Sequence, residues 1–160
     1  MTGLDKDLRE LVELFNARGI EFIVIGAHAL AFHALLRYTK DLDLFVRATK
    51  ENAERISDVL AELEGVRRFS ADDVLHPGHF IVIRVEPNRI DILTEIEAVS
   101  FDQAWANRVQ GELDGIPVAF IGLQDYLANK RATGRLQDLA DAERAEAIAR
   151  PKPKEEHGAD

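Results

Sequence analysis

Two aspartates separated by a single residue stand at the start of a short apolar segment. Asp41 and Asp43 belong to the run Asp41-Leu42-Asp43-Leu44-Phe45-Val46, which alternates polar and apolar residues over its first four positions. This alternation predicts a β-strand, and side chains two positions apart lie on one face, about 6–7 Å from each other. Such carboxylates repel each other unless a cation lies between them. Because Mg²⁺ prefers oxygen ligands and needs few carboxylates, the pair is a candidate magnesium site; an exposed strand face is the alternative.

A third aspartate has a similar setting. Asp91 is flanked by Ile90 and Ile92. If the isoleucines enter the core of a strand, Asp91 lies on the opposite face. Should this strand lie beside the one that carries Asp41 and Asp43, three carboxylates converge, which favours a metal site. The alternative is an ordinary outward residue next to a hairpin.

A glycine marks a turn between two elements of different composition. Gly26 follows an apolar, β-branched run at 21–25 and precedes an Ala- and Leu-rich run at 27–37, which predicts a strand, a turn and then a helix. A glycine at such a turn lets backbone N–H groups approach a phosphate, and a helix N-terminus favours negative charge. The sequence has neither the P-loop nor the dinucleotide-binding pattern at this turn.

The remaining elements are predicted from periodicity and from turn residues. Helices are expected over 4–18, 27–37, 50–63 with Thr49 as N-cap, 101–108, and as a pair within 123–149 broken near Gly134. Strands are expected over 21–25, 41–46, 80–85, 89–93, 109–113 and 116–121, with a further short strand at 66–69 followed by a loop to residue 78. This order predicts an α+β fold with a mixed sheet flanked by helices and a C-terminal helical pair. Residues 1–149 form the expected domain, and 150–160 a disordered tail.

Composition excludes several classes of protein. The 160 residues include no cysteine, so disulfides, cysteine zinc sites and thiol nucleophiles are excluded. No apolar run approaches the roughly 20 residues of a membrane span, and the charged N-terminal segment lacks a signal-peptide pattern, so we expect a cytoplasmic protein with no membrane partner. A net charge of −9 argues against binding nucleic acid through bulk charge. Arg67, Arg68, Arg131 and Arg135 form either a local basic strip for RNA or a solvated face.

Four segments together resemble the polymerase β-like nucleotidyltransferase superfamily. They are Ile25-Gly26-Ala27-His28-Ala29-Leu30, Arg37-Tyr38-Thr39-Lys40-Asp41-Leu42-Asp43-Leu44, Arg89-Ile90-Asp91-Ile92-Leu93, and the segment 127–141. The last is similar to a Lys, Arg and Asp motif of small bacterial members, which include nucleotidyltransferase toxins of abortive-infection and toxin–antitoxin systems. The resemblance covers residues 20–145.

The resemblance implies a role for each matching residue. Asp41 and Asp43 would bind two Mg²⁺ ions, and Asp91 would complete the second metal site and help to activate the acceptor hydroxyl. The nucleotide phosphates would be bound at the turn of Gly26 and Ala27 and by Lys130, near Asp138, and Arg37 is within reach of them. Catalysis would be an in-line displacement at phosphorus.

Two residues depart from the superfamily pattern. Ala27 stands where relatives have a second glycine or a serine, and Gln137 stands where they have a lysine. Both changes weaken triphosphate binding in principle. The resemblance therefore implies a Mg²⁺-dependent nucleotidyltransferase that transfers a nucleoside monophosphate from an NTP to a hydroxyl on RNA, protein or a small molecule. Because some members of the superfamily are toxins, it also implies a toxin role with an antitoxin partner. The alternatives are a degenerate relative that binds nucleotide or a partner chain, and a metal-independent protein with surface acids; the oligomeric state stays open.

Overall fold

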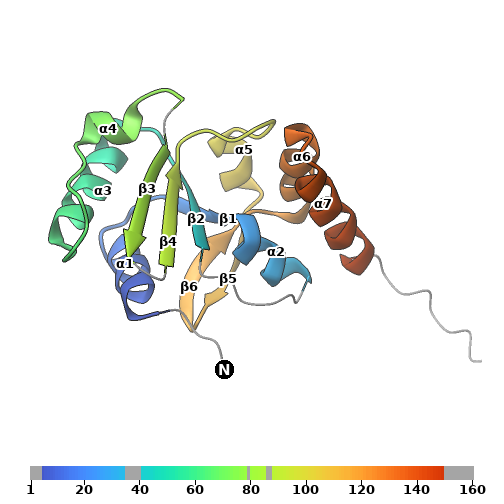
Figure 1. Ribbon diagram of the computed structural model, residues 1–160, viewed down its shortest axis with the longest axis horizontal. Helices are drawn as coiled ribbons and strands as arrows, with labels where there is room; N and C mark the ends of the chain where they lie inside the picture. The colour runs from blue at the N-terminus through green and yellow to red at the C-terminus, as the bar shows by residue number, and fades with distance from the viewer. Residues whose placement is uncertain (1–4, 35–40, 79, 86–87, 150–160) are drawn as a thin grey trace, which may run out of the picture.

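Six strands form one mixed sheet in the computed structural model, which describes residues 5–34, 41–78, 80–85 and 88–149. Its strands lie in the order β3-β4-β2-β1-β6-β5 (Figure 1). They are β1 (Phe22–Ile25), β2 (Asp41–Val46), β3 (Phe80–Val85), β4 (Asn88–Leu93), β5 (Val109–Leu113) and β6 (Ile116–Phe120). The hairpins β3–β4 and β5–β6 therefore flank the central strands β2 and β1.

The pairing of β2 with β4 determines which side chains meet at the centre of the sheet. The two strands are parallel, with Asp43 in register with Asp91 and Asp41 in register with Arg89. Strand β1 runs antiparallel to β2 on its other side, with Ile25 beside Asp43. The end of β1 therefore lies beside the Asp43 carboxylate.

Helices pack around the sheet in two groups. They are α1 (Lys6–Ala17), α2 (Gly26–Ala34), α3 (Lys50–Glu62), α4 (Ala71–Leu75), α5 (Phe101–Ala106), α6 (Leu123–Thr133) and α7 (Leu136–Ala149). Helices α1, α3 and α4 lie at one end of the molecule, and the α6–α7 pair lies at the other (Figure 1). Helix α2 packs against β1, β2 and α7. It thereby joins the C-terminal pair to the centre of the sheet.

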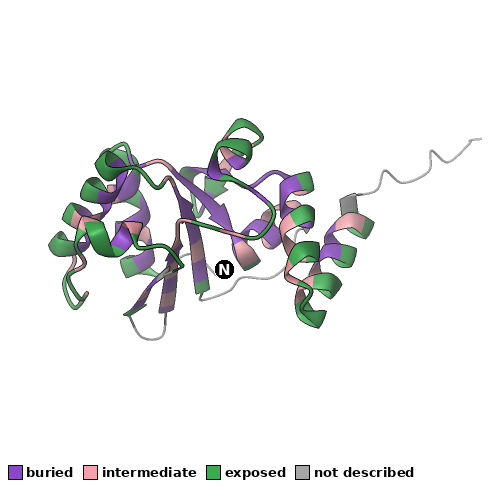
Figure 2. Ribbon diagram, turned by 90° about the horizontal axis from the view of Figure 1, so that it is seen from above, coloured by how far each residue is buried: buried purple, intermediate pink, exposed green. Residues whose placement is uncertain are grey.

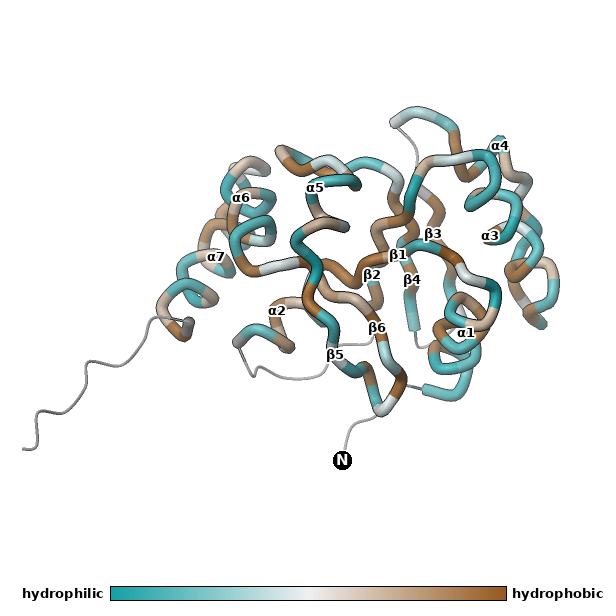
Figure 3. The backbone as a smooth tube through the Cα atoms, turned by 180° about the vertical axis from the view of Figure 1, so that it is seen from behind, coloured by the Kyte–Doolittle hydropathy of each residue, from teal (hydrophilic) through white to brown (hydrophobic). Residues whose placement is uncertain are grey.

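The core lies along the strands and the inward faces of the helices. Leu42, Leu44 and Ile90 are almost fully buried, whereas the aspartates that alternate with them are not. Buried residues follow the strands in Figure 2, and the same strands are the most hydrophobic part of the chain in Figure 3. Alternation thus holds one face of β2 and β4 in the core and leaves the other face for polar residues.

Most predicted elements are confirmed within a few residues, and the α+β fold with a mixed sheet is confirmed. Thr49 caps α3, because its side chain accepts a hydrogen bond from the backbone N–H of Asn52 at 3.2 Å. Gly134 ends α6 in the left-handed conformation, as the predicted break requires. The predicted helix 27–37 is described only as far as residue 34, and residues 35–37 and the tail 150–160 lie outside the described residues.

Two predictions for residues 66–78 are wrong. No strand forms at 66–69, where the two apolar residues are three positions apart and do not alternate as a strand requires. The expected loop contains helix α4. Ser70 and Asp73 form a capping box in which each side chain accepts a hydrogen bond from the other residue's backbone N–H, a signal that the sequence contained.

Among the described residues, no helix is both long enough and apolar enough to cross a membrane.

Candidate active site

Two carboxylates from neighbouring strands meet on the polar face of the sheet. Asp43 on β2 and Asp91 on β4 share a register position, and their side chains are joined by a hydrogen bond. Asp91 also accepts a hydrogen bond at 2.8 Å from Nε of Arg89, two positions earlier on β4. Asp43, Arg89 and Asp91 form what we call the strand wall of the site.

The environment of Asp43 disfavours a charged carboxylate. Burial, the neighbouring carboxylate of Asp91 and, to a smaller extent, Asp41 together raise the pKa of Asp43 to about 7. The ammonium group of Lys130 acts in the opposite direction. Two buried carboxyl groups that share a hydrogen bond hold a proton between them. A metal cation that binds both groups would replace that proton.

The turn between β1 and α2 lies directly against Asp43. Gly26 has φ +69°, a conformation that other residues rarely adopt. A Cβ at this position would lie 3.0 Å from Cγ of Asp43 and closer still to its Oδ2. Only glycine therefore leaves space for the carboxylate beside the start of α2.

The opposite side of the site comes from the C-terminal helices. Lys130 on α6 and Asp138 on α7 form an ion pair with Nζ and Oδ1 3.2 Å apart. Thr133 links the two helices further, because its hydroxyl lies 2.7 Å from Oδ2 of Asp138 and 2.9 Å from the carbonyl oxygen of Lys130. Lys130 also lies over the ring of the buried Tyr126, 5.7 Å from its centre. Lys130, Thr133 and Asp138 form the helix wall.

The hydrogen bonds within the helix wall favour an ionised Asp138. Burial alone would raise the pKa of Asp138, but hydrogen bonds from Thr133 and Lys130 outweigh it, and the pKa is lowered. The helix wall is therefore a satisfied ion pair, and its ammonium group is held in a fixed position near Asp43.

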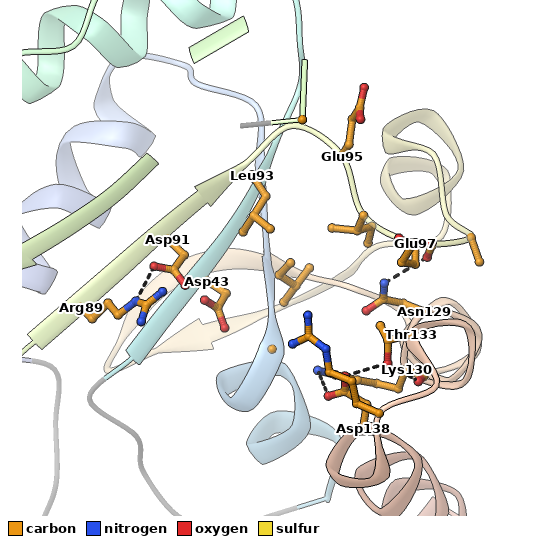
Figure 4. A pocket seen from close by; sticks show the side chains of 16 residues that line it. Asp43, Arg89, Asp91, Leu93, Glu95, Glu97, Asn129, Lys130, Thr133 and Asp138 are labelled. Carbon is orange, nitrogen blue, oxygen red and sulfur yellow. Dashed lines mark hydrogen bonds and ion pairs between the residues drawn. The ribbon is translucent and has the colours of Figure 1, made fainter. Parts of the chain in front are cut away.

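The two walls enclose a pocket of about 660 Å³. Figure 4 shows the side chains of the strand wall on one side and those of the helix wall on the other. The lining residues are Ile25, Gly26, Asp43, Gly78, Arg89, Asp91, Leu93, Glu95, Ile96, Glu97, Ala98, Asn129, Lys130, Thr133, Arg135 and Asp138. A pocket of this size can hold a nucleotide-sized ligand.

Five of the eight predicted site residues line this pocket: Gly26, Asp43, Asp91, Lys130 and Asp138.

The other three predicted residues lie elsewhere. Asp41 is exposed at the start of β2, beside Arg89, and Ala27 is exposed on the first turn of α2. Neither is among the described residues that line the pocket. Arg37 lies outside the described residues.

The carboxylates suit a hard cation that also binds a ligand. Across the described ranges, no group of three or more His, Asp or Glu side chains is placed to hold a metal ion. Asp43 and Asp91 supply two carboxylates with oxygen donors only. That set fits Mg²⁺, which commonly binds one or two carboxylates and completes its shell with water and substrate phosphates.

Sequence reasoning missed several residues of the pocket. Arg89 is two positions from Asp91, a spacing that places both on one strand face, and Thr133 is one helical turn after Lys130. These spacings could have identified Arg89 and Thr133 as neighbours of Asp91 and Lys130 from the sequence. Asn129 and Glu97 are different, because a hydrogen bond of 3.0 Å from Nδ2 of Asn129 to the Glu97 carbonyl joins segments whose proximity no local pattern predicts.

A family model described as "Nucleotidyltransferase of unknown function (DUF6036)" matches residues 1–151. No curated protein sequence matches the chain significantly.

Several solved structures share the fold. The lincosamide antibiotic adenylyltransferase LnuA, solved with lincomycin bound, is 13% identical, with 92% of this chain and 99% of that chain covered and a TM-score of 0.60. A protein described as a nucleotidyltransferase from Thermotoga maritima is 17% identical, with coverage of 88% and 87% and a TM-score of 0.52. ANT(2'')-Ia in complex with adenylyl-2''-tobramycin is 15% identical, with coverage of 89% and 92% and a TM-score of 0.54. At such low identities, the likeness concerns the fold.

Proposed function

The chain belongs to the nucleotidyltransferase family described as DUF6036, and on that premise we propose that it is a Mg²⁺-dependent enzyme that transfers a nucleoside monophosphate from an NTP to an acceptor hydroxyl. One observation carries the proposal. The Asp43–Asp91 pair faces Lys130 across a single pocket, and the glycine turn lies against the same carboxylates.

The chemistry of each wall suits a different part of the reaction. The Lys130 ammonium group, held by Asp138, would neutralise negative charge on the triphosphate. Gly26 lets the Asp43 carboxylate lie against the start of α2, where the helix dipole would also favour the negative charge of a phosphate. Asp91 would accept a proton from an acceptor hydroxyl.

Asp43 and Asp91 would hold the metal. When bound there, Mg²⁺ would neutralise the charge that develops on the phosphate oxygens. In the overall reaction the acceptor oxygen forms a bond to the α-phosphorus, the bond from that phosphorus to the β-phosphate bridging oxygen breaks, and pyrophosphate leaves.

Neither departure from the superfamily pattern falls among the described residues that line the pocket. Gln137 is exposed on α7, where its side-chain nitrogen donates a hydrogen bond of 2.9 Å to Oδ1 of Asp141. Ala27 is exposed on α2. This placement favours an active enzyme over a degenerate relative.

We infer that ATP is the first nucleotide to test and a small hydroxyl-bearing molecule the first acceptor. LnuA is an adenylyltransferase solved with lincomycin, and ANT(2'')-Ia was solved with an adenylylated tobramycin. Transfer to RNA or to a protein, and a toxin role with an antitoxin, stay predictions from the resemblance. The segment of Arg67 and Arg68 lies between α3 and α4, at the opposite end of the molecule from α6, which does not favour one continuous basic strip (Figure 1).

Calorimetric titration of ATP, GTP, CTP and UTP into the purified protein tests the proposal. We expect binding of at least one NTP in the presence of Mg²⁺ and its loss in EDTA. Incubation with [α-³²P]ATP and hydroxyl-bearing small molecules then measures transfer and pyrophosphate release. Binding that is the same with Mg²⁺ and with EDTA, or no binding at millimolar NTP, contradicts the proposal.

A further inference from the structure

Arg89 is a fixed positive charge within the group of carboxylates. It lies on β4 in register with Asp41 on β2, one step before the Asp43–Asp91 position. Four charged side chains therefore occupy two adjacent rows on one face of the sheet.

The contact between Arg89 and Asp91 is direct. Nε of Arg89 donates to Oδ1 of Asp91 at 2.8 Å, and the Asp91 side chain is only 17% exposed. Arg89 also lines the pocket, and its own side chain is 39% exposed. A guanidinium group has five N–H donors, so the group that engages Asp91 retains donors for phosphate oxygens in the pocket.

A guanidinium group and a divalent cation compete for the same carboxylate oxygens. Arginine stays protonated at any pH at which the protein is folded, so Arg89 cannot vacate the site by losing its charge. With Oδ1 of Asp91 occupied in this way, Asp43 is the carboxyl group of the strand wall that is left to hold a divalent ion. The superfamily arrangement of two metal ions would require Asp91 as a ligand of the second.

We propose that Arg89 is the resident counter-cation of Asp91, so that the pocket takes up one divalent ion per bound nucleotide, at Asp43, where relatives use two. The inference rests on the proposed function, because it concerns the same site. It assigns to Arg89 a positioning role: it replaces one metal ion and directs its free N–H donors toward the nucleotide phosphates.

Equilibrium dialysis against Mn²⁺ and α,β-methylene ATP measures this stoichiometry. Manganese bound to nucleotide alone is equal on both sides of the membrane, so the excess in the protein chamber counts only ions held by the protein–nucleotide complex. Manganese is determined by atomic absorption and nucleotide by absorbance. We expect one Mn²⁺ per bound nucleotide for the wild type and two for Arg89→Gln.

Two further variants keep the test decisive. Arg89→Lys retains the charge and should retain one Mn²⁺ per nucleotide, which covers the case in which Arg89→Gln does not fold. Arg84 lies directly opposite Arg89 on β3 and is not among the described residues that line the pocket, so Arg84→Gln is the matched control and should also retain one ion.

The outcomes separate this inference from the proposed function. Two Mn²⁺ per nucleotide in the wild type, or one in a folded Arg89→Gln protein, overturns the role of Arg89 and leaves the enzyme proposal standing. Nucleotide binding without any manganese, or no nucleotide binding, overturns both. An exchange-coupled Mn²⁺ electron paramagnetic resonance spectrum in Arg89→Gln alone is the expected spectroscopic counterpart of a second ion.

Discussion

The strand wall and the helix wall of the pocket each contain one cation paired with one carboxylate, but the two pairs are built differently. Arg89 and Asp91 are two residues apart on one strand, beside the further carboxyl group of Asp43. Lys130 and Asp138 come from two helices and have similar, low exposures of 16% and 14%. The strand wall therefore has one carboxyl group more than it has cations, whereas the helix wall has one of each.

This difference indicates that the two walls have different roles in the reaction. Carboxylates in excess of their cations need a further positive charge, which a metal ion would supply. A balanced pair that also bonds to Thr133 holds its ammonium group in place without a metal. The strand wall is thus suited to the reacting phosphorus and the helix wall to binding the triphosphate. Variants of each wall should affect different kinetic quantities.

The largest effect is expected at Asp43. Asp43→Asn should lower the rate of nucleotide transfer about a thousandfold, equivalent to about 4 kcal/mol of transition-state stabilisation, because it removes a carboxylate from the proposed metal site. The chain should stay folded, since a carboxyl group near like charges does not stabilise the fold. Transfer assays measure the rate, and urea unfolding measures the stability of the fold. Asp72→Asn, on the exposed face of α4, is the control. Normal transfer by the variant would refute a catalytic strand wall.

Gly26→Ala should weaken Mg²⁺-dependent NTP binding about a hundredfold, equivalent to roughly 3 kcal/mol. The added methyl group occupies the position of the Asp43 carboxylate, so that side chain must move. Gly65→Ala is the matched control, because Gly65 also has a positive φ, of +74°, but no atom lies within 4 Å of its would-be Cβ. Calorimetry compares the two variants. Equal losses of binding would mean that backbone strain, and not displacement of Asp43, is responsible.

Lys130→Met should raise the dissociation constant of the NTP roughly twentyfold, because a charge-assisted hydrogen bond contributes about 1.5–3 kcal/mol. The turnover of bound nucleotide should fall much less, unlike in Asp43→Asn. Arg131→Met, at the next position of α6, removes a charge that pairs with Glu146 and should leave binding unchanged. Separate measurement of KM and kcat tests whether the helix wall acts in binding and the strand wall in turnover. If kcat of Lys130→Met falls as far as that of Asp43→Asn, the two walls do not have these separate roles.

The raised pKa of Asp43 gives a pH-dependent effect on stability. Folded protein keeps this carboxyl group protonated up to about pH 7, whereas the unfolded chain ionises it near its ordinary pKa of 3.8. The folded state therefore binds more protons between those values, and the free energy of unfolding falls as the pH rises through them. In EDTA, Asp43→Asn should be stabilised relative to wild type by about 3–4 kcal/mol more at pH 8 than at pH 4.

Urea unfolding at the two pH values measures this difference. Saturating Mg²⁺ should reduce it at pH 8, because the ion would replace the proton on the wild-type carboxyl pair. A difference between the two proteins that does not change with pH would show that Asp43 ionises normally.

Ala27→Ser is expected to have the smallest effect. The serine hydroxyl supplies a donor on the first turn of α2, so NTP binding should stay the same or tighten by up to about threefold. Ala27→Val, without a donor, is the comparison. A clear loss of NTP binding in Ala27→Ser alone would indicate that phosphates do not approach this turn.

Local sequence patterns specify the elements that carry the site. Alternation in β2 and β4 placed Asp41, Asp43 and Asp91 on polar faces, because period-two patterns fix side-chain direction within one strand. Gly26 was identified from the change of composition across the turn, and the helical break from Gly134. These are local properties, and local rules of backbone geometry suffice for them.

Which of these residues meet depends on long-range packing. The order of strands in the sheet, with β2 parallel to β4, brings Asp43 to Asp91 and leaves Asp41 beside Arg89 at the exposed end. The packing of α7 against both α2 and α6 brings Lys130 of α6 within electrostatic reach of Asp43, far away in the sequence. Periodicity fixes the face on which a side chain lies, but neighbours across a sheet or between helices depend on long-range packing, which no single segment encodes.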